Sequence, residues 1–262
     1  MPDPLTPQQL QQVHRLLDQV AERQRNDFGH IVSDVKPDGS LITACDQWSD
    51  SAFVQGLAEI APGEGVLSEE GNHECPSSQA YWVVDPLDGT KEFLRPDGQG
   101  SFTVNIALIE KMEPVLGVIF APALDRMFHG FKGGGSVEKS PGREGPIQVR
   151  QLLESGSRAV ASRSHRNEET NRWLEAHQIR DTVSIGSSLK FCLVACGEAD
   201  VYPRFGPTME WDTAAGDAIL RAAGGLTIHP DGSVFRYGKA GYRNSSFIAY
   251  GQADRWEQKA SV

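Results

Sequence analysis

The chain has 262 residues, and its 35 Asp and Glu against 25 Lys and Arg give a formal net charge of −10. This length is enough for one large domain or two closely fused halves with a substantial core. The acidic balance argues against a protein that binds nucleic-acid polymers or anionic membranes through a basic surface. A small phosphorylated ligand is compatible with it, because bound metals can supply positive charge locally.

Cysteine usage and hydropathy bear on the compartment. No uninterrupted apolar run predicts a transmembrane helix, and the N-terminus lacks the basic and apolar regions of a secretory signal. Cys192 and Cys196 lie one helical turn apart, which fits half of a metal site or a pair of free thiols, and the pattern favours free thiols. We expect a cytoplasmic protein, with peripheral association at the inner membrane left open.

The N-terminal half combines two helices with a run of strands. Thr6 to Gln9 has the form of a capping box with Pro7 at the first helical position, and a helix of about five turns should follow. A turn is expected at 36–40, and a second helix should open at Asp46. Apolar runs joined by short turns then predict an antiparallel meander of four strands, at 81–85, 103–109, 115–121 and 127–131.

The C-terminal half has a different pattern. Residues 133–146 are rich in Gly and Pro, which fits a domain linker or a surface excursion between strands, with a strand resuming at 147–150. From residue 158 the pattern alternates between strands and helices, which indicates an α/β arrangement. We predict a single domain over residues 1–262, with an α+β part at about 1–150 and an α/β part at 151–262.

The most informative motif is W-V-V-D-P-L-D-G-T at 82–90. It places Asp85 and Asp88 at the end of an apolar strand, where Pro86 should halt strand pairing. Gly89 lets the backbone turn sharply and leaves the following amides free to point at an anion. Carboxylate ligands suit a hard cation such as Mg²⁺, which is commonly shared with substrate phosphates. Alone, the motif also fits an Asp-Pro turn followed by an Asp helix cap.

Two further acidic motifs lie elsewhere in the chain. Of Glu69 and Glu70, only one can face a site beside the neighbouring strand, because successive side chains of an extended chain alternate. Asp212 is expected at the start of a helix of small residues, where alone it would be a cap. Together, four carboxylates would repel one another unless cations neutralised them: Glu69, Asp85, Asp88 and Asp212.

The motifs S-E-E, D-P-L-D-G-T and W-D-T-A-A-G, in this order, resemble the lithium-sensitive, Mg²⁺-dependent phosphatase superfamily that includes inositol monophosphatase and fructose bisphosphatase. The segments 88–93, 102–109, 162–165, 186–191 and 202–208 resemble its 3'(2'),5'-bisphosphate nucleotidase branch, the bacterial CysQ type. The similarity runs from about Thr43 to about Gly225. It implies the layered αβαβα sandwich of the sugar-phosphatase type, a mixed α+β and α/β fold.

The resemblance implies a ligand set for two or three Mg²⁺ ions, with inhibition by Li⁺ and Ca²⁺. Asp85 would bridge the ions, Asp88 and Asp212 would complete one, and Glu69 with the Leu87 carbonyl would complete the other. Glu70 would lie outside this set.

The resemblance also implies a catalytic pair. The hydroxyl group of Thr90 would position the attacking water and would itself be held by Asp46, in general-base assistance without a covalent intermediate. From the residues alone, Thr90 is equally a helix cap.

The remaining implied roles concern the substrate. The residues assigned to substrate binding are Gly89, Thr90, Ser162, His165, Gly186, Lys190, Arg204 and Asp212. The amides after Gly89 would hold the phosphate that is cleaved. Ser187 and Ser188 fit a plain helix N-cap or a phosphate site in which Lys190 supplies the charge. His165 alone also fits an ordinary surface or core histidine.

The implied activity is hydrolysis of the 3'-phosphate of adenosine 3',5'-bisphosphate to AMP and phosphate, as part of sulfur metabolism. The same site could cleave 3'-phosphoadenylyl sulfate, and the protein would be a monomer or a homodimer. One alternative is an inositol monophosphatase or a broader sugar-phosphate phosphatase. Another is a non-catalytic nucleotide-binding protein on the same fold, against which the intact carboxylates, Thr90 and Asp46 count.

Overall fold

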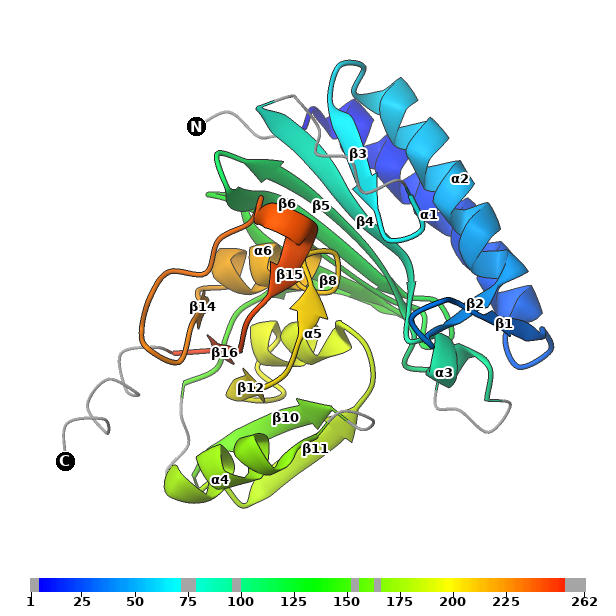
Figure 1. The fold of residues 1–262 in the computed structure, drawn as a ribbon. Helices are drawn as coiled ribbons and strands as arrows, with labels where there is room; N and C mark the ends of the chain where they lie inside the picture. Colours follow the sequence, from blue (N-terminus) through cyan, green and yellow to red (C-terminus); the bar gives the residue numbers. More distant parts are fainter. Residues whose placement is uncertain (1–4, 72–78, 96–99, 152–155, 163–165, 253–262) are drawn as a thin grey trace.

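The computed structural model describes residues 5–71, 79–95, 100–151, 156–162 and 166–252. Its largest element is a seven-stranded sheet in which the strands follow one another in chain order (Figure 1). The first pair is parallel and the others are antiparallel, which confirms the predicted meander. The strands are β3 (Gly65–Ser68), β4 (Ala80–Asp88), β5 (Thr103–Glu110), β6 (Glu113–Ala121), β7 (Arg126–Phe131), β8 (Gly135–Ser140) and β9 (Arg143–Ile147).

Helices α1 (Pro7–Asp27) and α2 (Ala44–Ile60) cover one face of this sheet (Figure 1). The predicted capping box of α1 is confirmed, since Gln9 N donates to Thr6 Oγ1 at 3.2 Å and Thr6 N donates to Gln9 Oε1 at 3.0 Å. Helix α2 starts two residues before the predicted position, because Thr43 is its N-cap and Asp46 completes a second capping box. Two short strands that we did not predict, β1 (Ser33–Val35) and β2 (Leu41–Thr43), flank the turn at 36–40.

Two sequence expectations about strands were wrong. Strand β4 does not stop at Pro86 but continues to Asp88, and its pairing with β5 shifts between Asp85 and Asp88. The irregular pairing at this point accommodates Pro86, which has no backbone N–H to donate to the neighbouring strand. Residues 133–146 are neither a linker nor an excursion, because most of them form the β8–β9 hairpin at the sheet edge. The turns before β8 and between β8 and β9 contain glycines with positive φ, Gly133 (88°) and Gly142 (73°).

The second sheet has five strands in the order β11-β10-β12-β16-β14, with β10 parallel to both of its neighbours. This confirms the predicted α/β pattern. The elements are β10 (Arg158–Ser162), α4 (Glu168–Ala176), β11 (Asp181–Ile185), α5 (Leu189–Ala195), β12 (Val201–Arg204), α6 (Ala214–Ala222), β14 (Leu226–Ile228) and β16 (Phe247–Tyr250). Smaller elements are α3 (Thr90–Phe93), β13 (Thr208–Met209), η1 (Ala240–Tyr242) and β15 (Arg243–Asn244).

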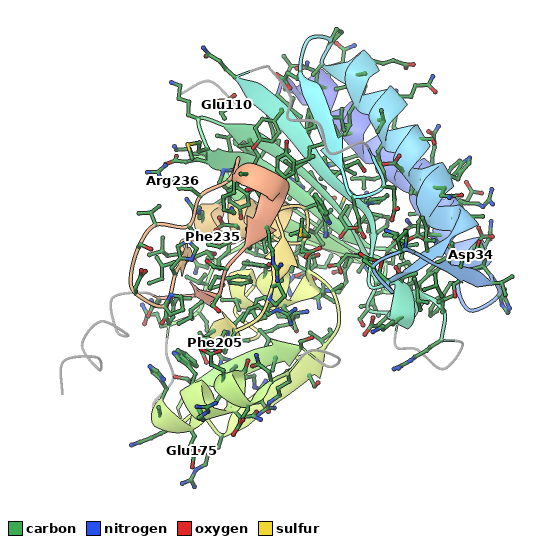
Figure 2. All side chains as sticks on the ribbon, viewed as in Figure 1. Asp34, Glu110, Glu175, Phe205, Phe235 and Arg236 are labelled. Atoms are coloured by element: carbon green, nitrogen blue, oxygen red, sulfur yellow. The ribbon has the colours of Figure 1, made fainter. Side chains whose placement is uncertain are left out.

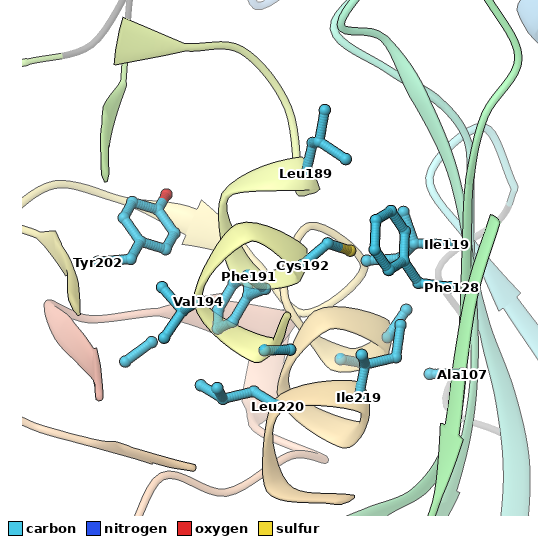
Figure 3. Close-up of a cluster of buried hydrophobic side chains, with 14 of the residues drawn as sticks. Ala107, Ile119, Phe128, Leu189, Phe191, Cys192, Val194, Tyr202, Ile219 and Leu220 are labelled. Carbon is cyan, nitrogen blue, oxygen red and sulfur yellow. The ribbon is translucent and has the colours of Figure 1, made fainter. Parts of the chain in front are cut away.

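The main hydrophobic core lies between the two sheets, around α5 and α6. Figure 3 shows Ile119 and Phe128 of the large sheet facing Cys192 of α5 and Ile219 of α6, with Tyr202 of β12 on the far side. Helix α4 covers the outer part of the second sheet (Figure 1). The layers therefore run helix, sheet, helix, sheet, helix, and this confirms the fold that the sequence implied.

Two further observations concern membranes and thiols. Over the ranges described, no helix combines the length and the apolar character that crossing a membrane requires. Cys45, Cys192 and Cys196 are free cysteines, and burial raises the pKa of the Cys45 and Cys196 thiols to about 12. The reading of Cys192 and Cys196 as free thiols is confirmed, and Cys75 lies outside the described residues.

Candidate active site

Three carboxyl groups from distant parts of the sequence converge at one end of the large sheet. One oxygen from each of Glu69, Asp85 and Asp212 lies within 4.8 Å of the others. Asp85 belongs to β4, and Glu69 follows the parallel strand β3, with its N–H bonded to the Val84 carbonyl group at 3.1 Å. The predicted acidic set thus comes together for three of its four members.

Asp212 reaches this group from the loop between β13 and α6. The alternative reading of Asp212 as a helix cap is wrong, because α6 begins at Ala214 and its N-cap is Thr213. The carboxyl group of Asp212 instead accepts a hydrogen bond from Met209 N at 2.7 Å. This bond fixes the loop in front of the helix and uses only one of the two carboxyl oxygen atoms of Asp212.

The acidic set has little compensation from the protein. Asp85 is buried, its Oδ1 accepts from Leu87 N at 3.1 Å, and its Oδ2 accepts no hydrogen bond from the described residues. Burial, followed by the charges of Glu69 and Asp88, raises the pKa of the Asp85 carboxyl group well above its usual value. Burial likewise raises the pKa of Asp212 to about 8 and that of Glu69 to about 7. Such a set is stabilised by a bound cation.

Asp88, the fourth predicted acid, lies beside this group and on the wall of a cavity. Its Oδ2 accepts a hydrogen bond from Ser188 N at 2.5 Å. Burial raises the pKa of the Asp88 carboxyl group, while the charge of Lys190 and the bond from Ser188 oppose the rise. Asp88 therefore joins the acidic set to the residues at the start of α5.

A lysine that we did not predict contacts the glutamate pair. Lys36, in the turn between β1 and β2, lies 3.2 Å from Glu69 Oε1 and 2.6 Å from Glu70 Oε1. Burial lowers the pKa of Lys36, but the bonds to Glu70 and Glu69 outweigh it and raise the pKa overall. The two glutamates thus share Lys36, and Glu70 makes the shorter contact with it.

The proposed catalytic pair is less directly supported. Asp46 accepts from Thr43 N at 2.8 Å and from Thr43 Oγ1 at 2.5 Å, so its carboxyl group closes the capping box of α2. Thr90 is the first residue of α3, after Gly89 with φ of 95°, and it lines the cavity. No hydrogen bond joins Thr90 to Asp46 in the part of the chain that the structure describes. The role of this pair stays a prediction.

A cavity of about 850 Å³ opens beside Asp88 and Asp212. Its walls include Asp38 and Leu41 from the β1–β2 region and Phe205 after β12, which Figure 2 labels. Eight of the predicted site residues line it: Asp88, Gly89, Thr90, Ser162, Gly186, Lys190, Arg204 and Asp212. His165 lies outside the described residues.

Lys190 is the buried cation of this cavity, with 5% of its surface exposed. Its Nζ donates to the Ser187 carbonyl group and lies 5.3 Å from the centre of the Tyr202 ring. Burial lowers the pKa of Lys190 to about 8, although the charge of Asp88 opposes this. A buried ammonium group beside an aromatic ring favours an anionic ligand in the cavity.

The segment before α5 packs tightly against the other half of the molecule. A Cβ atom on Gly186 would lie 2.9 Å from the Glu92 carboxyl group and 2.9 Å from Ser101 Oγ, so a larger residue here would displace these side chains. Ser188 is the N-cap of α5, yet its side chain does not cap the helix. Its hydroxyl group instead donates to Asn105 Oδ1 on β5 at 2.5 Å. Ser188 is therefore the N-cap by position, as we considered, but its hydroxyl group bonds to β5 and not to the helix.

Lys36, Glu92 and Asn105 were missed by the sequence analysis. Glu92 and Asn105 lie within the motif segments that we quoted, but nothing in their local sequence shows which distant residue they contact. Only the packing of 186–188 against β5 and α3 reveals their positions.

Comparisons with known proteins agree with this geometry. The profile of the Inositol monophosphatase family matches residues 1–260. The 3'(2'),5'-bisphosphate nucleotidase CysQ of Salmonella typhimurium is 46% identical over 205 residues, which cover 77% of this chain and 81% of that protein. The protein of that name from Escherichia coli strain K12 is 45% identical over 222 residues, covering 80% and 88%.

Solved structures show the same relationship. CysQ from Bacteroides thetaiotaomicron, described as a bacterial member of the inositol monophosphatase family, aligns with a TM-score of 0.77 at 37% identity, covering 88% of this chain and 93% of that one. An IMPase from Thermotoga maritima aligns with a TM-score of 0.77 at 25% identity, covering 94% and 93%. The family is metal-dependent, which fits the acidic set. The predicted enzyme class, a phosphatase, is confirmed, and the chain belongs to the inositol monophosphatase family.

Proposed function

We propose that this protein is a Mg²⁺-dependent phosphatase that hydrolyses the 3'-phosphate of adenosine 3',5'-bisphosphate to AMP and phosphate. The observation that carries the proposal is the cavity that joins Asp88 and Asp212 to Lys190 and Arg204. An acidic wall suits metal ions, and a basic wall suits a second anionic group on the substrate. The names of the relatives at 43–46% identity support the same substrate.

The acidic residues fit a hard divalent cation. Asp85 Oδ2 is buried without a hydrogen-bond partner in the described chain, and the converging donors are all oxygen atoms. We assign the ions to Glu69, Asp85, the Leu87 carbonyl group, Asp88 and Asp212. When bound, two or three Mg²⁺ ions neutralise phosphoryl charge and lower the pKa of a coordinated water.

The residues around this set would orient the reacting groups. Thr90 lies on the cavity wall one residue after Gly89, where its hydroxyl group can accept or donate to the attacking water. Asp46 would hold Thr90 in this orientation, and to do so its carboxyl group must exchange its bonds to Thr43. Lys190 would hold the phosphate that is not cleaved, through a charge-assisted hydrogen bond.

The nucleoside would occupy the part of the cavity next to the end of β12. Arg204 lines this region, with its Nη2 donating to the Pro207 carbonyl group at 3.2 Å. Tyr202 and Phe205 line it as well and offer apolar surface to a base. Ser162 adds a hydroxyl group at the end of β10. An inositol phosphate needs neither a second cationic contact nor an aromatic wall.

Phosphate release from a panel of substrates tests the proposal. With Mg²⁺, adenosine 3',5'-bisphosphate should have a higher kcat/KM than inositol 1-phosphate, 3'-phosphoadenylyl sulfate or an aryl phosphate. Chelator should remove the activity, Li⁺ should inhibit it, and Ca²⁺ should compete because it relaxes the octahedral geometry that Mg²⁺ requires. A preference for inositol 1-phosphate would instead assign the activity of the IMPase relatives, and full activity in chelator would exclude the metal mechanism.

A further inference from the structure

A chain of hydrogen bonds connects β5 to the start of α5 behind the acidic set. Thr103 Oγ1 lies 2.8 Å from Ser188 Oγ, and Ser188 Oγ donates to Asn105 Oδ1 at 2.5 Å. The backbone N–H of the same serine donates to Asp88 Oδ2 at 2.5 Å. All four residues are largely removed from solvent, and Asn105 is only 1% exposed. Ser188 therefore contacts both strands that form the acidic end of the sheet.

The hydroxyl protons in this chain have one consistent direction. Ser188 has a single hydroxyl proton, and it is used toward Asn105 Oδ1. Thr103 must then be the donor in its contact with Ser188. Since Oδ1 of Asn105 faces Ser188, its Nδ2 faces the opposite side of the amide group. The amide of Asn105 is thus oriented by the two hydroxyl groups.

The side chain of Asn105 lies on the same side of the sheet as Asp85. Its Nδ2 is buried without a standard hydrogen-bond partner among the described residues, and Asn105 pairs with Asp85 across the two strands. Burial raises the pKa of Asp88, and the amide of Asn105 is one of the groups that lower it again. Ser188, which donates to both Asp88 Oδ2 and Asn105 Oδ1, also places the amide of Asn105 beside the Asp88 carboxyl group.

We propose that Asn105, oriented by Thr103 and Ser188, is a positioning residue that holds the Asp88 carboxyl group in the orientation that binds metal. This inference rests on the proposed role of Asp88 as a metal ligand. Groups that orient a metal ligand commonly change metal affinity or activity by about 10- to 100-fold when they are removed. Because Ser188 begins the helix that carries Lys190, metal affinity also depends on the position of α5.

Magnesium binding without substrate tests this inference. Asn105→Leu keeps the approximate size of the side chain and removes both the acceptor and the donor. Titration of the metal-free protein, followed by calorimetry and by the shift in Tm, should give an affinity about 10- to 100-fold weaker than that of the wild type. Ser188→Ala, which keeps the N–H bonded to Asp88, and Thr103→Val should each weaken binding by a smaller factor.

The matched control is Thr227→Val in β14. Thr227 is also fully buried, and its hydroxyl group has no hydrogen-bond partner in the described chain, so this variant removes a buried hydroxyl away from the site. It should bind Mg²⁺ as the wild type does. For Asn105→Leu, kcat at saturating Mg²⁺ should return to within about threefold of the wild-type value, which general damage to the site would not allow.

The outcomes separate this inference from the proposed function. An Asn105→Leu protein that folds and binds Mg²⁺ within twofold of the wild type would refute the positioning role, provided that Asp88→Asn loses affinity. If Asp88→Asn also binds normally, the assignment of Asp88 as a ligand is wrong, and with it both proposals. Should Asn105→Leu fail to fold, Ser188→Ala decides, since unchanged affinity in that variant contradicts the role given to the hydroxyl chain.

Discussion

Glu210 and Asp85 are both buried carboxylates, but the protein surrounds them very differently. Glu210 is fully buried and accepts from Gly238 N at 2.8 Å and Lys239 N at 2.9 Å, with Lys239 Nζ at 2.8 Å. Asp85 receives one backbone N–H, and its nearest charged neighbours are other acids. Two more buried acids follow the first pattern, since Asp200 pairs with Arg150, and Asp217 with Arg221.

This difference indicates that the acidic end of β4, unlike the surroundings of Glu210, needs a bound cation. The chain supplies donors for buried acids wherever their role is to hold loops and strands together. At the end of β4, Asp85, Asp88 and Asp212 each accept a backbone N–H, but burial and neighbouring acids still raise their pKa values. Removing a charge should therefore have opposite consequences in the two regions.

The largest expected effect is the loss of turnover in Asp88→Asn. The amide removes one negative ligand, so Mg²⁺-dependent phosphate release should fall below detection. The free energy of unfolding of the metal-free protein should stay constant or increase, because repulsion among the acids decreases. Activity assays and urea unfolding measure the two quantities. An active Asp88→Asn protein would mean that the central motif has been misinterpreted.

Glu210→Gln is the matched variant in the other region. It keeps the size of the side chain and one acceptor but weakens the bonds from two backbone N–H groups and Lys239. We expect the free energy of unfolding to decrease by about 1.5–3 kcal/mol. A decrease of similar size in Asp88→Asn would remove the distinction between the two regions.

Thr90→Ala should lower kcat by about 10²- to 10⁴-fold if the hydroxyl group orients the attacking water. The Mg²⁺ affinity should change little, because Thr90 is not among the proposed ligands. Thr90→Ser retains the hydroxyl group and should keep much of the rate. If the alanine and serine variants have equal kcat values, Thr90 serves only to begin α3.

Lys190→Met tests the contribution of the basic side of the cavity separately from that of the acidic side. Loss of a charge-assisted contact to phosphate should cost about 1.5–3 kcal/mol, or roughly 10- to 150-fold in kcat/KM, for adenosine 3',5'-bisphosphate. Methionine keeps the length of the buried side chain, so α5 should remain folded. The kcat/KM for inositol 1-phosphate, which has no second phosphate, should hardly change. Equal losses on both substrates would place Lys190 in the common catalytic machinery.

The smallest expected effect is on the stability of the metal-free protein between pH 6.5 and 8. The folded-state pKa values of Glu69 and Asp212, about 7 and about 8, lie above the unfolded ones, so the folded protein holds protons that the unfolded chain has released. Stability should thus decrease as pH rises, by at most about 1.4 kcal/mol per pH unit for each group. His129, with a pKa lowered by burial to about 4, titrates below this window.

Thermal unfolding at fixed ionic strength measures this effect. Each kcal/mol should lower Tm by about 2–4 °C. Saturating Mg²⁺ should reduce or reverse the trend, because it binds the deprotonated carboxylates. A Tm of the metal-free protein that is independent of pH in this window would show that the acids ionise freely without a cation.

Much of the architecture could be predicted because its signals are local. The capping box at Thr6 and Gln9 and the apolar alternation of β5 and β6 depend on neighbouring residues. The β8–β9 hairpin was missed because its strands are polar at the sheet edge and its glycines fit a linker equally well. Asp212 was placed in a helix because its bond to Met209 N cannot be read from composition.

The candidate site was predictable only in part for the same reason. Carboxylates in dense motifs are easily found, and Glu69, Asp85 and Asp212 do converge. The partners of those carboxylates come from distant segments, as Lys36 comes to the glutamate pair and Asn105 to Ser188. Nothing in the sequence around these residues specifies such long-range pairs.

The shifted pairing of β4 decides which way the central carboxylates point. Side chains alternate along a strand, so residues three apart, such as Asp85 and Asp88, would ordinarily face opposite sides of the sheet. Their partners, Asn105 and Thr103, are two apart and share one side. The one-residue slip at Pro86 therefore turns Asp88 to the side of Asp85. The slip is thus as important to the D-P-L-D motif as its acids, since regular pairing of all four residues would place Asp88 on the side of the sheet that α1 and α2 cover.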